Sequence, residues 1–354
     1  RMVTEYVAQF LKEHTNLTVR RQHVQDGRYN LIAANTDSPK LMLIGHTDTV
    51  KPSAGALHDP FAAEIEDGVM YGLGATDMKS GVASILSAAA LYRGRPEIML
   101  AFYVDEEYDF AGMQALLPQM TGIKPEFILS GDGGELKTGN ACRGIAEIHG
   151  IIRGVAAHAG RPEAGKNAIN GTVDMFRDLN EQLQRYTNEA LGTCSVNLAT
   201  LQAGKAIEND GQTTITEQVN SVPDIARFKA DIRLASTEVN PKVIMTIMRD
   251  FAEANGYSLG DMKTHHDLGA WYTPQVQIGD FLSIVENVTG SNEMRDPRKS
   301  GYVDLQMLWK ALGEPPAATF GPGHALHEPN EYVATDAIVQ SRDVYINTIA
   351  HYDK

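Results

Sequence analysis

The sequence has few cysteines, no long apolar run and no basic tract. Its 354 residues include 2 cysteines, so a disulfide framework does not hold the fold, which suits a reducing compartment. The most apolar helical stretch, residues 82–92, is shorter than the ~20 residues of a membrane span. Acidic residues exceed basic ones by 45 to 31, which argues against nucleic acid and membrane surfaces as partners. The opening residues favour a helix and not a signal peptide, so we expect a cytoplasmic protein.

Apolar strands and helices alternate at both ends of the chain. Runs at 41–45, 97–104 and 126–130 predict strands that are buried on both faces. Residues 79–93 predict a helix that stops before Gly94, and Asp67 with Gly68 predicts a hairpin turn between 62–66 and 69–73. The tail predicts a helix at 303–312, a strand at 317–320 and a helix at 335–350. This alternation predicts an α/β layer architecture.

The middle of the chain has a different pattern. Half-exposed strands are predicted at 145–155, 195–201, 225–236 and 257–265, and amphipathic helices at 167–184 and 241–255. The order strand, helix, strand, strand, helix, strand resembles a small split βαβ sandwich. We therefore expect an inserted α+β domain of the ferredoxin-like type at 145–267, between the two parts, 1–144 and 268–354, of an α/β domain.

Imidazole and carboxylate side chains follow the predicted buried strands. The carboxyl ends of strands in open α/β sheets form the binding crevice, and the groups that would meet there are His46, Asp48, Glu106, Glu107, Asp132, His324 and His327, with Asp77 just before the helix at 79. The carboxylates of such a cluster would repel one another unless bound cations neutralise their charge, and mixed His, Asp and Glu donors suit zinc. One carboxylate can bridge two ions. Asp48 lies on the same side of an extended segment as His46, where it can accept the second imidazole N–H.

The motifs that carry these groups are GHTDTV at 45–50, DPF at 59–61, YGLGATDMKSG at 71–81, DEE at 105–107, AHAGRP at 157–162, GPG at 321–323 and HEPNEYV at 327–333. Together they resemble the zinc-dependent aminoacylase, acetylornithine deacetylase, succinyl-diaminopimelate desuccinylase and carboxypeptidase G superfamily. The matches run in order over nearly the whole chain. The resemblance implies a mixed-sheet catalytic domain with two zinc ions, for which cobalt or manganese can substitute, and an inserted lid or dimerisation domain.

The resemblance also implies roles for single residues. Asp77 would bridge the two zinc ions, with His46 and Asp132 on one ion and Glu107 and His327 on the other. Glu106 would be the general base that takes a proton from water and passes it to the leaving nitrogen. In dimeric relatives the histidine that corresponds to His158 reaches the partner's active site and stabilises the oxyanion, so a homodimer is implied.

Two residues of the inserted domain are implied to contact the substrate. They are Asn220 and Arg233, and the planar guanidinium of Arg233 would pair with a substrate carboxylate. Two departures from the family pattern concern specificity. Asp132 stands where deacetylases and desuccinylases usually have Glu, whereas dipeptidase and tripeptidase relatives have Asp there. The 204–220 connection is also longer than usual.

We therefore predict a di-zinc amide hydrolase that removes an acyl group from an N-acyl amino acid, of succinyl-diaminopimelate or acetylornithine type. The alternative is a metallo-carboxypeptidase or dipeptidase of carboxypeptidase G type, acting on a short peptide. A nicotinamide-dependent oxidoreductase that uses Gly72 and Gly74 as a phosphate loop is disfavoured, because Asp77 replaces the third glycine and a hairpin precedes the loop. A binding module without activity is disfavoured because Glu106 and all the expected ligands are present.

Overall fold

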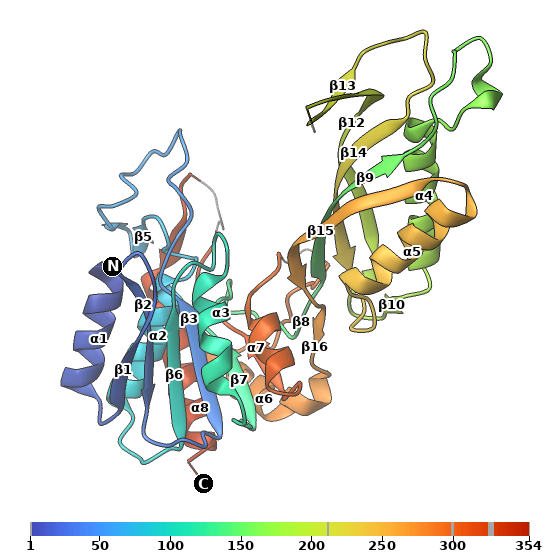
Figure 1. Cartoon of the computed structure of the whole chain (residues 1–354). Helices are drawn as coiled ribbons and strands as arrows, with labels where there is room; N and C mark the ends of the chain where they lie inside the picture. Colours follow the sequence, from blue (N-terminus) through green and yellow to red (C-terminus); the bar gives the residue numbers. More distant parts are fainter. Residues whose placement is uncertain (1, 211, 299–300, 325–328, 354) are drawn as a thin grey trace. The chain divides into compact units, whose positions relative to one another are not determined.

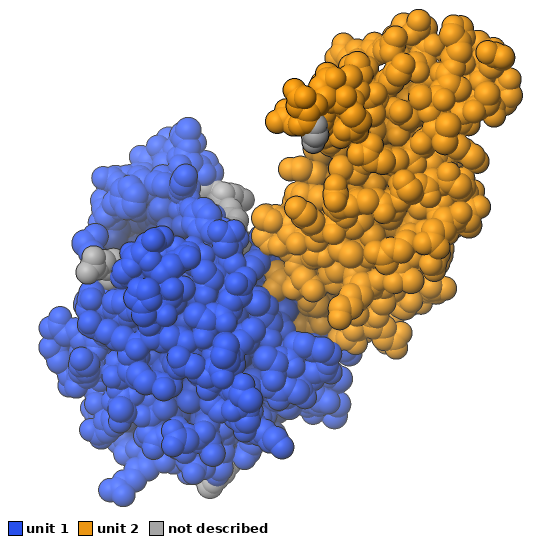
Figure 2. All heavy atoms as spheres, in the orientation of Figure 1, with its two compact units in different colours: residues 1–141, 272–354 blue, residues 142–271 orange. Residues whose placement is uncertain are grey.

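The computed structural model describes residues 2–210, 212–298, 301–324 and 329–353. The chain divides into two units (Figure 2), the first formed by residues 1–141 and 272–354 and the second by residues 142–271. Within the described residues, no helix combines the length and the hydrophobicity needed to cross a membrane.

A six-stranded mixed sheet forms the centre of the first unit (Figure 1). Its strands, in spatial order, are β1 (Thr18–Gln25), β2 (Arg28–Ala34), β6 (Ile98–Tyr103), β3 (Leu41–His46), β7 (Phe127–Ser130) and β17 (Ala317–Thr319). Strand β2 is antiparallel to β1 and to β6, whereas β6, β3, β7 and β17 are parallel to one another. The predicted α/β class with a mixed sheet is confirmed.

Helices bury both faces of the central strands. Every residue of β3 and of β6 is buried, which explains why both runs are apolar throughout. The helices of this unit are α1 (Met2–His14), α2 (Lys79–Leu91), α3 (Ala111–Leu116), α6 (Gly279–Thr289), α7 (Leu305–Ala311) and α8 (Thr335–His351), with short 3-10 turns η1 (Leu117–Met120) and η3 (Gln275–Ile278). Helices α1, α2, α6 and α8 share one apolar core with the sheet.

The structure has two further small sheets, one within the first unit and one where the chain passes between the two units. The predicted hairpin forms β4 (Glu64–Glu66) and β5 (Val69–Tyr71), and its turn residues Asp67 and Gly68 have φ of 48° and 80°. Strand β18 (Tyr332–Ala334) pairs with β5, so the segment before β18 lies beside the loop that follows β5. A second small sheet pairs β8 (Ala141–Cys142) with β16 (Trp271–Tyr272).

The second unit is an antiparallel sheet with two helices on one face (Figure 1). Its strands, in spatial order, are β13 (Gln212–Thr216), β12 (Ser195–Asn209), β14 (Ile225–Leu234), β9 (Gly144–Arg153) and β15 (Ser258–Leu268). The helices are α4 (Ala168–Leu183) and α5 (Pro241–Ala254), and asparagine side chains cap both N-termini. A turn η2 (Pro162–Ala164) and a small hairpin of β10 (Thr187–Asn188) and β11 (Gly192–Thr193) are added. The predicted order of the main elements is confirmed.

The 204–220 segment differs from the long connection that the sequence suggested. Strand β12 continues to Asn209 and forms a hairpin with β13, with Lys205 opposite Thr216 and Asn209 opposite Gln212. Most residues of this hairpin are exposed or half-exposed, and many of them are polar. The sequence of the segment therefore resembles that of a loop.

Candidate metal centre

Three parallel strands of the first unit end at the same edge of the sheet. His46 is the last residue of β3 and stands opposite Tyr103, the last residue of β6. Ser130, the last residue of β7, stands opposite Ile44. The loops that follow β6 and β7 therefore begin beside His46, and they carry Glu106, Glu107 and Asp132. The sheet topology accounts for the meeting of these groups.

The predicted ligands meet in two overlapping groups. One ligand atom from each of His46, Asp77 and Asp132 lies within 4.8 Å of the others, and the same holds for His46, Glu106 and Glu107. The His46 imidazole is fully buried, and its Nε2 lies 2.8 Å from Oδ1 of Asp77. The predicted ligand His327 lies outside the described residues. The described His324 is 37% exposed, and its Nδ1 lies 3.9 Å from a carboxylate oxygen of Glu135.

Asp48 joins the two strand ends. Its carboxylate accepts the backbone N–H groups of Glu106 and Glu107, at 3.3 and 3.2 Å. Nδ1 of His46 lies 3.2 Å from the carbonyl oxygen of Asp48 and 3.7 Å from its Oδ1. Burial raises the pKa of Asp48, but the contacts with His46 and with the two backbone N–H groups lower it overall. Asp48 therefore positions both the imidazole and the Glu106 turn.

Glu331 holds the loop that carries Asp77. Its carboxylate accepts the backbone N–H groups of Gly74, Thr76 and Asp77 at 2.8, 2.6 and 2.7 Å. Glu331 is 4% exposed, and it precedes β18, whose pairing with β5 brings it beside the loop. Sequence reasoning included Glu331 in a motif without giving it a role.

The charge of the centre fits bound cations. Burial raises the pKa of Asp132 to about 7, and the neighbouring Asp77 adds to this effect. Burial also raises the pKa of Glu106 well above its usual value, with a further contribution from Asp304. For His46, burial lowers the pKa, but Asp48 and Asp77 together raise it well above its usual value. Buried carboxyl groups that repel one another beside an imidazole form a donor set that a divalent cation would neutralise.

Sequence reasoning also missed Asp304, which comes just before α7. Asp304 is 1% exposed, and the hydroxyl of Tyr103 donates a hydrogen bond to its Oδ1 at 2.8 Å. Among the described residues, no hydrogen-bond partner reaches its Oδ2. Burial raises its pKa to about 7 despite the bond from Tyr103. No motif marks this aspartate, and it is identified as part of the centre by its hydrogen bond from Tyr103 and by the effect of its charge on the pKa of Glu106.

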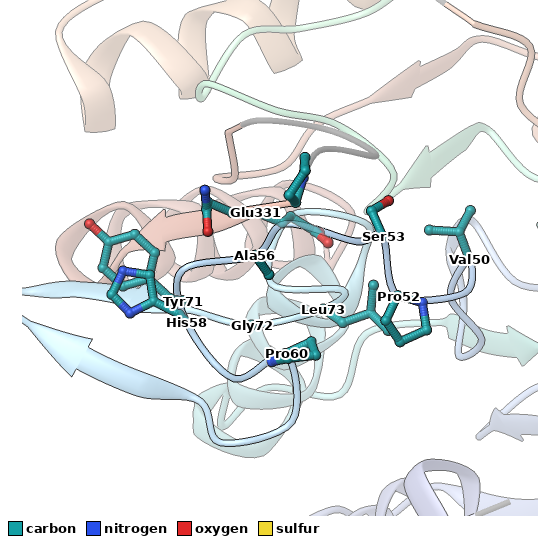
Figure 3. A pocket seen from close by; sticks show the side chains of 12 residues that line it. Val50, Pro52, Ser53, Ala56, His58, Pro60, Tyr71, Gly72, Leu73 and Glu331 are labelled. Atoms are coloured by element: carbon teal, nitrogen blue, oxygen red, sulfur yellow. The ribbon is translucent and has the colours of Figure 1, made fainter.

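A hollow borders the loop that Glu331 holds. Figure 3 shows the residues that line it, which come from the loop at residues 50–60, from Tyr71, Gly72 and Leu73, and from the segment that carries Glu331. The rings of His58 and Tyr71 stack with centroids 3.9 Å apart. Because Gly72 and Leu73 lead directly to Asp77, the hollow and the candidate metal ligands share one loop.

The remaining predicted residues belong to the second unit. His158 and Asn220 lie on neighbouring segments, where the backbone N–H of Ala159 donates to the carbonyl of Asn220 at 3.0 Å. His158 is exposed, and its Nδ1 accepts the backbone N–H of Gly160 at 3.1 Å. Arg233 lies on β14, where its Nε and Nη2 donate to the two carboxylate oxygens of Asp231 at 2.8 and 3.1 Å.

Comparison with known proteins identifies the family. The model of peptidase family M20/M25/M40 matches residues 42–351. The chain belongs to this family. The predicted class, a metal-dependent hydrolase of amide bonds, is thereby confirmed, and the oxidoreductase alternative is wrong.

Three similar proteins show the range of the family. The succinyl-diaminopimelate desuccinylase of Acidiphilium cryptum (strain JF-5) is 32% identical over 334 residues, which cover 89% of this chain and 84% of that protein. The acetylornithine deacetylase of Edwardsiella ictaluri (strain 93-146) is 26% identical over 95% of this chain and 87% of that protein. The crystal structure of the Bacillus subtilis YXEP protein, a dinuclear metal-binding peptidase of the M20 family, has the same fold, with a TM-score of 0.65 at 16% identity and coverage of 99% and 92%.

Proposed function

We propose that this chain hydrolyses the amide bond of an N-acyl amino acid, of the succinyl-diaminopimelate or acetylornithine type. The observation that carries the proposal is the group of the buried His46 and Asp77 with the half-buried Asp132, with Glu106 and Glu107 beside it, at the carboxyl edge of the sheet. The 32% identity to a desuccinylase over 89% of the chain supports the substrate type.

We propose that the first unit holds two metal ions. His46, Asp77 and Asp132 would hold one ion, and Asp77, Glu107 and His327 the other. Zinc is proposed because imidazole and carboxylate donors suit it, with cobalt or manganese as substitutes. When bound, such ions supply Lewis-acid chemistry, which polarises the amide carbonyl and makes water acidic enough to ionise near neutral pH.

Glu106 is proposed as the general base. Its backbone N–H donates to Asp48, so the turn that carries its carboxylate is fixed, and that carboxylate lies within 4.8 Å of a ligand atom of His46. From this position Glu106 would take a proton from the attacking water on its carboxylate oxygen and return it to the nitrogen that leaves.

The second unit is proposed to recognise the substrate. Nδ1 of His158 accepts a backbone N–H, so in the neutral imidazole the proton lies on Nε2, where it can be donated to the developing oxyanion. Asn220 lies on the neighbouring segment and is proposed to contact the substrate. Arg233 is proposed to bind the substrate carboxylate through the same kind of bidentate contact that its guanidinium makes with the carboxylate of Asp231.

We also propose that residues 145–267 act as a lid and dimerisation domain, that the chain is a homodimer, and that it works in the cytoplasm. The family resemblance of the His158 segment supports the dimer, and the low cysteine count suits a reducing compartment. Size-exclusion chromatography with light scattering would test the dimer, and a mass equal to one chain would contradict it.

The test of function is the release of free amine by the zinc-loaded chain from a panel of substrates. The panel contains succinyl-diaminopimelate, acetylornithine, other N-acyl amino acids, acyl-glutamates and dipeptides. We expect turnover of one N-acyl amino acid that stops when a chelator is added. A preference for acyl-glutamates or dipeptides would instead support the carboxypeptidase alternative. A chain that binds no metal and releases no amine would contradict both.

A further inference from the structure

Four titratable side chains gather on the second unit, on the face of the sheet opposite the helices. They are Glu147 and His149 on β9 and His265 and His266 on β15, two strands that lie side by side (Figure 1). The helix face is identified by Phe228 of β14, whose ring packs against Phe176 of α4. Phe228 stands opposite Gly150, so Glu147 and His149, at odd positions of β9, lie on the other face.

A β-bulge brings the two consecutive histidines to Glu147. Thr264 stands opposite Ile148 and Asp267 stands opposite Ala146, so the two histidines between them face the single residue Glu147. In a regular strand, consecutive side chains point to opposite faces. A bulge places two residues opposite one, and here it puts both imidazoles beside the same carboxylate.

The distances define three ligand positions. One ligand atom from each of Glu147, His265 and His266 lies within 4.8 Å of the others. Nε2 of His266 lies 3.8 Å from Oε2 of Glu147, and the rings of His265 and His266 have centroids 4.5 Å apart. Ligand atoms around a tetrahedral zinc ion lie about 3.3 Å apart, so rotation of these partly exposed side chains can close the group around an ion.

His149 holds the carboxylate in place. Its Nε2 lies 2.6 Å from Oε1 of Glu147, which leaves Oε2 on the side of His266. Lys229 and Lys263 stand opposite His149 on the two neighbouring strands, and their ammonium charges disfavour an ion directly beside it. His149 is therefore placed to orient a ligand rather than to be one.

We propose that Glu147, His265 and His266 bind one divalent cation of the zinc type, with His149 as a positioning residue for Glu147. Two imidazoles and a carboxylate are a donor set that zinc accepts, with solvent completing the coordination. The ion would link β9 to β15, which is the strand at the edge of the sheet. The link would lie where the bulge interrupts the regular pairing of these two strands. The proposal does not depend on the catalytic function.

The test compares the zinc content of two full-length chains. The wild-type chain and the double variant His265→Asn/His266→Asn are dialysed against micromolar zinc, and bound metal is measured by mass spectrometry. We expect the variant to bind one zinc ion per chain fewer than the wild type, whatever number the first unit holds. Equal zinc content in both chains would overturn the proposal. His23→Asn, which removes an exposed strand histidine in the other unit, is the matched control and should not change the content.

Three further variants keep the test decisive if the double variant folds poorly. The single variant Glu147→Gln should lose the same ion, and zinc should raise the melting temperature of the wild type more than that of this variant. His149→Asn should keep the ion but bind it about 10–100-fold more weakly, and His149→Gln, which can still donate to Glu147, should restore part of the affinity. Unchanged zinc affinity in His149→Asn would remove its positioning role.

Discussion

The two units gather imidazoles and carboxylates in different ways. In the first unit, His46 and the loops that carry Glu106 and Asp132 meet because parallel strands end at one edge of a sheet. In the second unit, Glu147 and His265 meet in the middle of two antiparallel strands, because of their register. Most of the first group is buried, whereas every member of the second is at least partly exposed. Topology therefore produces a shielded site, whereas register produces a surface site.

The contrast predicts how metal leaves the chain. A chelator added to the zinc-loaded chain should first remove the ion at Glu147, because His265 is exposed, and only later the ions at the buried His46. Amine release should survive the first step and fall to background with the second. Timed sampling of metal content and activity in the same reaction measures both. The variant His265→Asn/His266→Asn should lack the fast step, and activity that falls with the first ion would contradict the assignment of the two groups.

The first unit should also be the more sensitive to a single substitution. Glu106→Gln removes the proposed base but keeps the size of the side chain and the contact of its backbone with Asp48. We expect amine release to fall by about 10²–10⁴-fold, as for loss of a general base, with unchanged zinc content. The exposed Glu97→Gln is the control. Glu106→Gln with wild-type turnover would show that another group moves the proton.

The sequence predicted the first group better than the second. His46, Asp77 and Asp132 were predicted because each follows a strand or precedes a helix, and parallel strands bring such positions together whatever their separation in the sequence. His265 and His266 gave no such signal, because consecutive residues of a regular strand face opposite ways and only the bulge aligns them. Asp304 was missed for the related reason that its contact with Tyr103 joins segments 201 residues apart.

The same limit applies to the fold. The buried strands β3, β6 and β7 and the amphipathic helices α4 and α5 were predicted because their apolar spacing is set by what covers them, whereas the buried strand β2 and the helix α6 were not predicted. The polar strands β1 and β13 were missed, since exposed residues at the border of a sheet carry little of that spacing. Strand pairing and register depend on contacts between distant segments, so the position of these strands in the sheets cannot be read from local sequence patterns.

Glu331 provides a smaller test of the first unit. Glu331→Gln replaces one carboxylate oxygen by an amide NH₂, so at least one of the backbone N–H groups of Gly74, Thr76 and Asp77 loses its acceptor. We expect the free energy of unfolding of the metal-free chain to fall by about 1–3 kcal/mol and the zinc affinity by about 10–100-fold. Urea unfolding and zinc titration measure the two effects. The exposed Glu97→Gln should change neither, and an unaltered zinc affinity in Glu331→Gln would show that the loop does not need this carboxylate.

The second unit should respond more weakly, because its proposed substrate contacts are made at partly exposed side chains. Arg233→Lys keeps the charge but loses the planar fork that now contacts both oxygens of Asp231. If the same fork binds a substrate carboxylate, KM should rise by about tenfold while kcat changes less, since the contact is made equally in the ground state and the transition state. Arg227→Lys is the matched control on the same strand, where the guanidinium donates to the carbonyl of Thr213. A KM that stays at the wild-type value in Arg233→Lys would confine Arg233 to its pair with Asp231 and leave substrate recognition to other residues.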